Sequence, residues 1–230
     1  MNVNATILTT PCPDLTVSEH YFLTLDFNIF KDEKQHFALA KDFIIELNTN
    51  PYARPGIKLI RSKSSITALI GNLTTVKIGN DQLLVSPEGC CIYFNELPLP
   101  STENHLNTEN TLLGNFQGVS IESANLAESL IFWLKIGFTQ VGGSAESGWL
   151  MLKNEDNFDL NVMRFGMCPH FFSNPGLNFF NGTENPKIIQ EIKRRNLPIR
   201  QEITFFKPGE PAENIIMSDQ GGLCCFIFND

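Results

Sequence analysis

The chain has 230 residues, of which 42% are apolar, 10% aromatic and 18% charged, a composition typical of a folded globular protein and not of a disordered or fibrous one. Its 25 acidic and 17 basic residues give a net charge of −8, which leaves no surplus of Lys and Arg to bind nucleic acid or an anionic membrane surface. No apolar run approaches the roughly 20 residues that cross a bilayer, and the start of the chain has no signal-peptide pattern. We therefore expect a cytoplasmic protein with no nucleic-acid or membrane partner and with its cysteines as free thiols.

The first half of the chain alternates short strand-like runs with two helical segments. The apolar spacing predicts one helix over residues 16–25 and another over 64–70, and Gly71 is expected to end the second. Strands are predicted at residues 7–10, 28–30, 37–40, 43–47, 57–61, 75–78, 82–85 and 91–94.

The second half repeats the same alternation. A strand is predicted over residues 116–123, followed by a helix that Asn125 caps and Gly137 ends. A second helix is predicted to have Asn185 as its N-cap and Pro186 at its first position. Further strands are predicted at residues 138–141, 149–153, 160–165, 177–181, 203–206, 215–218 and 223–228.

The two halves are similar in sequence as well as in pattern. Residues 14–27 align without gaps on residues 125–138, and residues 90–96 align on residues 224–230, each of these two beginning with a Cys-Cys pair. The polar stretch between the halves contains two prolines and is typical of a linker. The sequence thus predicts a first domain over 1–99, a linker over 100–114 and a second domain over 115–230, each domain containing two βαβββ units.

Short motifs in both halves suggest a family. The residues that carry the likeness are Val119-Ser120-Ile121, Asn125-Leu126, Ser129, Phe132-Trp133 and Ile136-Gly137-Phe138, together with the turns Ser86-Pro87-Glu88-Gly89 and Ser218-Asp219-Gln220-Gly221. They are similar to the opening strand, the D-L-x-x-S helix start, the aromatic pair, the L-G-F segment and the D-P-D-G turn of the vicinal oxygen chelate superfamily. The chain therefore resembles the glyoxalase and bleomycin-resistance proteins, over nearly its whole length and twice.

This resemblance implies an α+β fold in which four βαβββ units pair into two cup-shaped mixed-sheet domains with helices packed outside. Metal-dependent members of the superfamily hold a divalent metal with His, Gln or Glu on the first strand of a unit and with a Glu on the last strand. The matching positions here are Ile7 and Gly118 on first strands, and Tyr93 or Cys91 and Cys225 on last strands. None supplies a carboxylate or imidazole. We therefore predict that the protein has no metal site and no cofactor.

Glu122 is the most prominent candidate for binding chemistry. Strand alternation places Ser120 and Glu122 on the cup face, while Val119 and Ile121 face the helix. A carboxylate there could orient a substrate donor or serve as a base, or it could lie exposed at the end of the strand. Arg164 could supply its counter-charge or hold an anionic ligand.

Other candidates complete the predicted site. Aromatic side chains such as Trp149 and Phe180 suit a planar ligand, although most aromatic residues at strand spacing belong to the core. One cysteine of each Cys-Cys pair should face the helix and the other the cup, either as a core residue or as a reactive thiol. His170 and Cys168 form a suggestive local pair with no third ligand, and Lys193-Arg194-Arg195 suits a helix C-terminus. The predicted ligand-binding set is Ser120, Glu122, Trp149, Arg164, Asn178, Phe180 and Cys225.

Three functions follow from these observations. The favoured hypothesis is a glyoxalase/bleomycin-resistance-like protein without the usual metal ligands that binds a small, partly aromatic molecule, preferentially in the second cup. The alternative is a metal-dependent lyase, isomerase or dioxygenase of the same superfamily, in which a register shift brings Gln117 into the site. The third is a structural or interaction protein whose cups are filled by their own side chains. The two domains could pair with each other within the chain or with a second chain as a homodimer.

Overall fold

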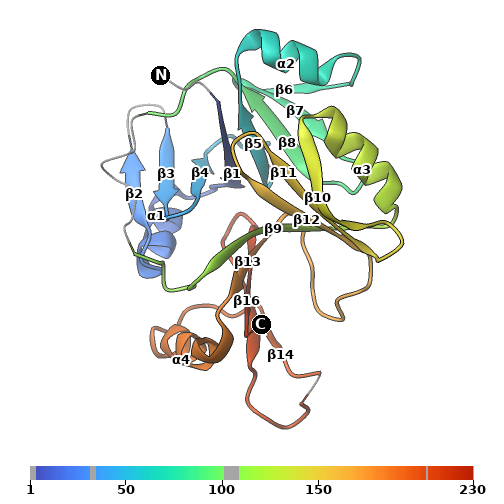
Figure 1. Cartoon of the computed structure of the whole chain (residues 1–230). Coiled ribbons are helices and arrows are strands. Elements are labelled where there is room, and N and C mark those ends of the chain that lie inside the picture. The colour runs from blue at the N-terminus through green and yellow to red at the C-terminus, as the bar shows by residue number, and fades with distance from the viewer. Residues whose placement is uncertain (1–3, 32–34, 101–108, 206, 230) are drawn as a thin grey trace.

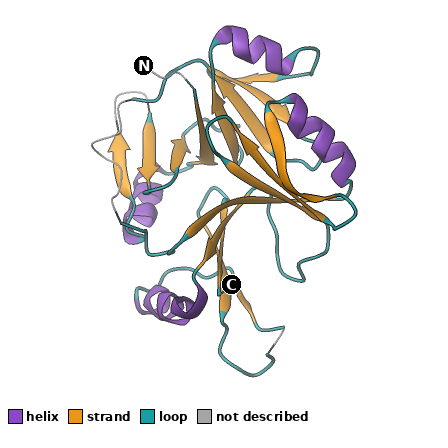
Figure 2. Cartoon of the chain, viewed as in Figure 1, coloured by secondary structure: helices purple, strands orange, loops and turns teal. Residues whose placement is uncertain are grey.

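The structure is a computed structural model that describes residues 4–31, 35–100, 109–205 and 207–229. In these residues two mixed sheets of eight strands form the framework, and four α-helices pack outside them (Figure 1). Figure 2 shows how the helices flank the two sheets. The predicted α+β class and the division into four βαβββ units are confirmed.

The first sheet carries the helices α1 (Leu15–Thr24) and α2 (Lys63–Ile70). Its strands are β1 (Ala5–Pro11), β2 (Asn28–Lys31), β3 (His36–Leu39), β4 (Ile44–Asn48), β5 (Gly56–Ile60), β6 (Val76–Ile78), β7 (Asp81–Val85) and β8 (Cys91–Asn95). They lie in the order β2-β3-β4-β1-β5-β8-β7-β6. The opening strands of the two units, β1 and β5, are antiparallel at the centre, and each pairs in parallel with the last strand of its own unit.

The second sheet repeats this arrangement in the order β10-β11-β12-β9-β13-β16-β15-β14. Its strands are β9 (Phe116–Ser123), β10 (Phe138–Ser144), β11 (Trp149–Asn154), β12 (Asp159–Arg164), β13 (Gly176–Phe180), β14 (Gln201–Ile203), β15 (Asn214–Ser218) and β16 (Cys224–Phe228). The helices are α3 (Leu126–Lys135) and α4 (Asn185–Arg194), with the short 3₁₀ helix η1 (Gly182–Glu184) before α4. Equal strand order in the two sheets agrees with the repeat in the sequence.

The first helix of each domain begins in the same way. The side chains of Asp14 and Asn125 accept hydrogen bonds from the backbone N–H groups of Val17 and Glu128, so both are N-caps. Such a cap satisfies one of the backbone donors that the first helical turn leaves unpaired. Gly137 follows α3 with a φ of 95°, a left-handed conformation that glycine adopts without strain. These features confirm the predicted start and end of α3.

The start of α4 differs from the prediction. Asn185 is the first residue of the helix rather than its N-cap, since η1 and Glu184 precede it. The Asn185 side chain is fully buried and donates to the backbone carbonyls of Glu213 and Ile227, at 2.6 and 3.2 Å. Asn185 therefore attaches the helix to the strands beneath it, a role that depends on tertiary contacts absent from the local sequence.

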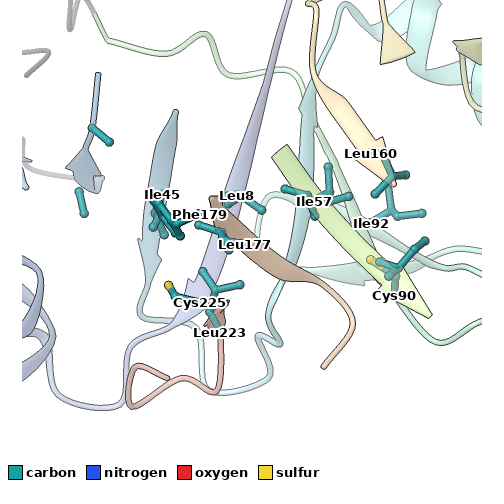
Figure 3. Close-up of a cluster of buried hydrophobic side chains, with 14 of the residues drawn as sticks. Leu8, Ile45, Ile57, Cys90, Ile92, Leu160, Leu177, Phe179, Leu223 and Cys225 are labelled. Carbon is teal, nitrogen blue, oxygen red and sulfur yellow. The ribbon is translucent and has the colours of Figure 1, made fainter. Parts of the chain in front are cut away.

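One hydrophobic core joins the two domains. It includes Leu8, Ile57 and Ile92 from the first sheet and Leu160, Leu177 and Phe179 from the second (Figure 3). Phe43 of the first domain packs against Phe116 of the second, with ring centroids 4.2 Å apart. The domains are thus paired within one chain.

The helices confirm this pairing and show how the units combine. In Figure 1, α2 and α3 lie on the upper right of the molecule, and α1 and α4 lie on its left. Leu69 of α2 packs close to Gly137 at the end of α3, and Arg195 at the end of α4 pairs with Asp26 after α1. The second unit of the first domain, with α2, therefore meets the first unit of the second domain, with α3. The first unit of the first domain, with α1, meets the second unit of the second domain, with α4.

The predicted linker over 100–114 lies partly outside the described residues. Its last part, however, is packed: Leu113 is fully buried in the core, and the Leu112 backbone N–H donates to the Leu25 carbonyl. Among the described helices, none combines the length and the apolar character that crossing a membrane requires.

Candidate functional site

The cup face of the second sheet brings together two of the predicted residues. Asn178 on β13 donates a side-chain hydrogen bond to the Ser120 hydroxyl on β9, and both residues are buried. Val119 and Ile121, between the cup-facing residues of β9, lie in the main core with Trp133 of α3. The alternation of β9 is therefore as predicted.

The loop from β12 to β13 folds over part of this cup. Phe172 packs on Phe226 with ring centroids 4.8 Å apart, and His170 contacts Phe228 at 5.4 Å. Phe180 stacks on Phe228 from the neighbouring strand and remains 38% exposed. The protein's own aromatic side chains thus occupy the half of the cup beside β16.

Glu122 lies at the rim of the cup, where its backbone is tightly held. The Asn174 side chain accepts from the Glu122 N–H at 2.8 Å and donates to the Glu122 carbonyl at 3.0 Å. The same Asn174 amide also donates to the Glu88 carbonyl of the first domain. The Glu122 backbone is therefore fixed at the junction of the two domains.

The Glu122 carboxylate is less well satisfied than its backbone. Its Oε1 atom is buried without a hydrogen-bond partner among the described residues. Burial raises the pKa of Glu122 above its ordinary value, although the Gly166 N–H and the nearby His170 oppose the shift. A half-buried carboxylate with a free oxygen is a potential acceptor for a ligand.

A cavity of about 420 Å³ lies beside Glu122. It is lined by three glutamates and two phenylalanines together with small and amide residues, and its lining contains no Lys or Arg. The lining is Pro87, Glu88, Glu122, Ser123, Ala124, Asn125, Glu128, Phe165, Phe172 and Asn174. Both Glu88 oxygens are already engaged by α3, one by Trp133 Nε1 at 2.7 Å and one by the Ser129 hydroxyl at 2.8 Å.

The remaining predicted residues are not brought to this cavity. Arg164 is exposed and donates to the Ala145 carbonyl, so it does not pair with Glu122. Trp149 is 42% exposed on β11 and pairs in register with Met163, two strands away from Glu122. Gln117 lines a separate pocket with Asp42 and Asp159, so the register shift that would bring it into the predicted site is not observed.

Cys225 was predicted to contact the ligand, but its strand places it elsewhere. It pairs in register with Leu177 and lies with it in the main core, on the helix-facing side of the sheet. Burial raises the pKa of the Cys225 thiol well above its ordinary value, which keeps it protonated. Its neighbour Cys224 takes the cup side, beside Phe226. The two cysteines thus face opposite sides, with the orientations exchanged relative to the prediction.

The first cup contains a charged cluster that the sequence reasoning missed. Lys58 on β5 is only 4% exposed, and its Nζ lies 2.6 Å from Glu46 Oε1 and 2.9 Å from Asp81 Oδ2. Asn48 and Asn95 also line this cup, which encloses about 420 Å³. Each charge stands within a mainly apolar strand, as in the run Gly-Ile-Lys-Leu-Ile, and that isolation was the available signal.

The residues present do not fit the divalent metal that the resemblance implies. Ile7 lies in an apolar cluster with Phe37 and Leu39, and Gly118 offers no side chain. The Tyr93 hydroxyl is engaged with the backbone of Arg54. Across the described ranges no three His, Cys, Asp or Glu side chains are arranged to hold an ion.

Comparisons with known proteins show which solved structures have a similar fold. Neither known protein-family profiles nor curated proteins match the sequence. Solved structures do match: a catechol 2,3-dioxygenase with a TM-score of 0.54 and 11% identity, over 96% of this chain and 90% of that chain. Homoprotocatechuate 2,3-dioxygenase from Arthrobacter globiformis has a TM-score of 0.55 and 9% identity, over 97% and 79%. An extradiol ring-cleaving dioxygenase from B. fuscum has a TM-score of 0.53 and 10% identity, over 99% and 71%. At such identity the likeness concerns the fold alone.

Proposed function

We propose that this chain, which has the vicinal oxygen chelate fold in two tandem copies, binds a small organic cation with an aromatic or apolar part in the cavity beside Glu122. The observation that carries the proposal is that Glu122 lines that cavity while its carboxylate has one oxygen, the buried Oε1, without a hydrogen-bond partner among the described residues. An ammonium or guanidinium group donates strong hydrogen bonds to such an oxygen.

The charge of the cavity supports a cationic ligand. Glu88, Glu122 and Glu128 all line it, and no basic side chain does. Because Glu88 is already engaged by α3, Glu122 and Glu128 are the carboxylates of the lining that remain for a new ion pair. An anionic ligand would face repulsion from all three groups.

The two phenylalanines support an aromatic or apolar part in the ligand. Phe172 is held in place by Phe226, while Phe165 is 71% exposed. A cation within about 6 Å of an aromatic ring gains roughly 0.5–2 kcal/mol. The apolar part of a ligand would also cover the Phe165 side chain and remove its surface from water.

The metal-dependent alternative has support from the three structural neighbours reported above, all of which are dioxygenases by name. That likeness extends to the fold, whereas the donor set of this chain does not suit a divalent ion at the positions that the resemblance indicates. A metal-free binding function therefore fits the described side chains better.

The test is a binding experiment with matched probes of equal shape. Benzylammonium and phenylguanidinium are expected to bind, while benzyl alcohol and benzoate are expected to bind at least tenfold more weakly, as measured by calorimetry. Glu122→Gln should weaken binding of the cations by roughly 10- to 150-fold, since hydrogen bonds to charged groups contribute about 1.5–3 kcal/mol. Glu210→Gln, an exposed charge away from the cavity, is the control.

Two outcomes would refute the proposal. One is unchanged cation affinity in the Glu122→Gln variant, and the other is benzoate affinity equal to that of benzylammonium. A rise of the unfolding temperature on adding Mn²⁺ or Fe²⁺ to the wild-type protein would instead favour the metal-dependent alternative.

A further inference from the structure

Lys58 lies at the floor of the first cup, between the two halves of its sheet. Its strand, β5, is central, and the two carboxylates that hold it come from strands on opposite sides, Glu46 from β4 and Asp81 from β7. Each acid is two strands away from β5, so the side chains reach across the intervening strands β1 and β8 to bring the three charges into contact. The Lys58 ammonium thus joins the first βαβββ unit of the domain to the second.

The outer oxygens of both carboxylates have partners of their own. The Thr9 hydroxyl donates to Glu46 Oε2 at 2.7 Å, and the Asn95 amide donates to Asp81 Oδ1. These bonds leave Glu46 Oε1 and Asp81 Oδ2 directed at Lys58. The two carboxylates are therefore oriented toward a single central cation.

The burial of this cluster shows that the cation is required. The side chains of Lys58 and Asp81 are 5% and 7% exposed, and two buried carboxylates without a cation would lose both solvation and their counter-charge. Elsewhere in the same cup Ile7, Phe37 and Leu39 fill the space with apolar contacts. The fold thus fills one part of the cup with apolar side chains and keeps three charges in the other.

We propose that Lys58 is the resident cation of the first cup: its ammonium takes the position between Glu46 and Asp81 that a bound divalent ion would otherwise take. The wild-type first cup therefore excludes metal ions. Removal of the Lys58 side chain creates an oxygen-lined cation site from residues already in place. Carboxylate and amide oxygens suit hard ions such as Mg²⁺, Ca²⁺ and Mn²⁺, and the adjoining cavity has room for the waters that complete their coordination.

The experiment compares wild-type protein with Lys58→Ala, using Mn²⁺ binding measured by electron paramagnetic resonance and unfolding temperature with and without the ion. Lys58→Ala is expected to bind Mn²⁺ at least about tenfold more tightly than wild type. Its unfolding temperature, lowered in chelator, should rise with Mn²⁺ and also with methylammonium, which replaces the lost charged group. Adding Asp81→Asn to Lys58→Ala should abolish the gain in Mn²⁺ affinity.

Lys153→Ala is the matched control, because Lys153 pairs with Asp159 in a half-exposed ion pair and its loss should create no ion site. If Lys58→Ala does not fold in chelator, the triple variant Lys58→Met, Glu46→Gln, Asp81→Asn should fold without any ion. The proposal is overturned if Lys58→Ala gains no affinity for Mn²⁺, if wild type binds Mn²⁺ equally well, or if Lys58→Met alone in chelator is as stable as wild type.

Discussion

Glu122 and Lys58 show two opposite solutions for a charge inside a cup. Lys58 has both of its carboxylate partners within 3 Å, and the cluster is complete without a ligand. Glu122 lines a cavity and retains a buried oxygen without a hydrogen-bond partner among the described residues, so its carboxylate is the less completely satisfied charge of the two. For this reason we assign the candidate binding function to the cavity beside Glu122, at the rim of the second cup, and a structural cation to the first cup.

The raised pKa of Glu122 predicts how cation binding depends on pH. Only the ionised carboxylate attracts a cation, so affinity is full at neutral pH and falls as pH drops through the pKa of Glu122. Because burial raises that pKa, the loss should begin at a higher pH than for an ordinary glutamate. Calorimetric titration with benzylammonium between pH 7 and 4 measures it; Glu122→Gln should give a shallower profile, because Glu88 and Glu128 remain in the lining.

His170 and Cys168 lie near enough to Glu122 to interact with it electrostatically. The same titration in His170→Gln separates the two groups: the fall in affinity should persist. A fall that disappears with His170→Gln would show that the imidazole, and not Glu122, controls binding.

At the scale of the elements, α3 and α4 are fixed to the fold in different ways. Asn125 caps α3 locally, and Glu88 from the other domain binds Ser129 and Trp133 on the same helix. Asn185 at the start of α4 instead satisfies two carbonyls of the strands below. The loss of a cap exposes a backbone donor to water, whereas the loss of Asn185 leaves buried acceptors without partners.

This difference predicts the cost of three alanine variants. Asn125→Ala and Asp14→Ala should each lower the free energy of unfolding by about 1 kcal/mol, because the two residues are equivalent caps of the repeat. Asn185→Ala should cost more, roughly 2–4 kcal/mol, since buried polar groups lose their bonds. Urea unfolding measures all three, and equal losses at Asn125 and Asn185 would contradict the assigned roles.

At the scale of the whole molecule, the two domains are tied by polar contacts that cross between them. The buried Arg61 of the first domain pairs with Glu155 and Asp156 of the second at 3.1 and 2.7 Å. Asp219, in the turn before the last strand, accepts from the Thr10 hydroxyl of the first domain at 2.6 Å. Glu88, in the equivalent turn of the first domain, binds α3 of the second, so the two turns make reciprocal contacts.

Asp219 makes the stability of this interface depend on pH. Burial raises its pKa from 3.8 to about 6, so between these values the folded state holds a proton that the unfolded state has released. Stability from this group is therefore greatest below pH 4 and decreases as pH rises to about 6, by about 3 kcal/mol in total. Asp219→Asn should remove this decrease, so the difference in unfolding free energy between variant and wild type should grow from pH 4 to pH 6.

Asp219 also interacts electrostatically with Tyr21, Cys224 and Cys225. None is an acid that ionises between pH 4 and 6, so they should not mask the effect. A constant difference in unfolding free energy across this range would show that Asp219 does not titrate in the folded protein.

The fold was largely predictable from the sequence because its signals are local or repeated. Strand alternation, the cap at Asn125 and the glycine after α3 depend on neighbours in the chain, and the repeat supported the same pattern in both halves. The strand predicted over residues 116–123 has the same bounds as β9. The two-domain pattern and the four βαβββ units followed from these signals and from the superfamily resemblance.

The sequence by itself also determined that the expected metal-ligand positions carry Ile7, Gly118 and Cys225, because the residue type at each position is read directly from the sequence. Only the tertiary structure decided which charges meet. Lys58 reaches Glu46 and Asp81 across the strands that lie between them, while Arg164 donates to the Ala145 carbonyl instead of pairing with Glu122. Contacts between strands that are not neighbours in the sheet depend on sheet curvature and loop packing, which strand periodicity does not encode.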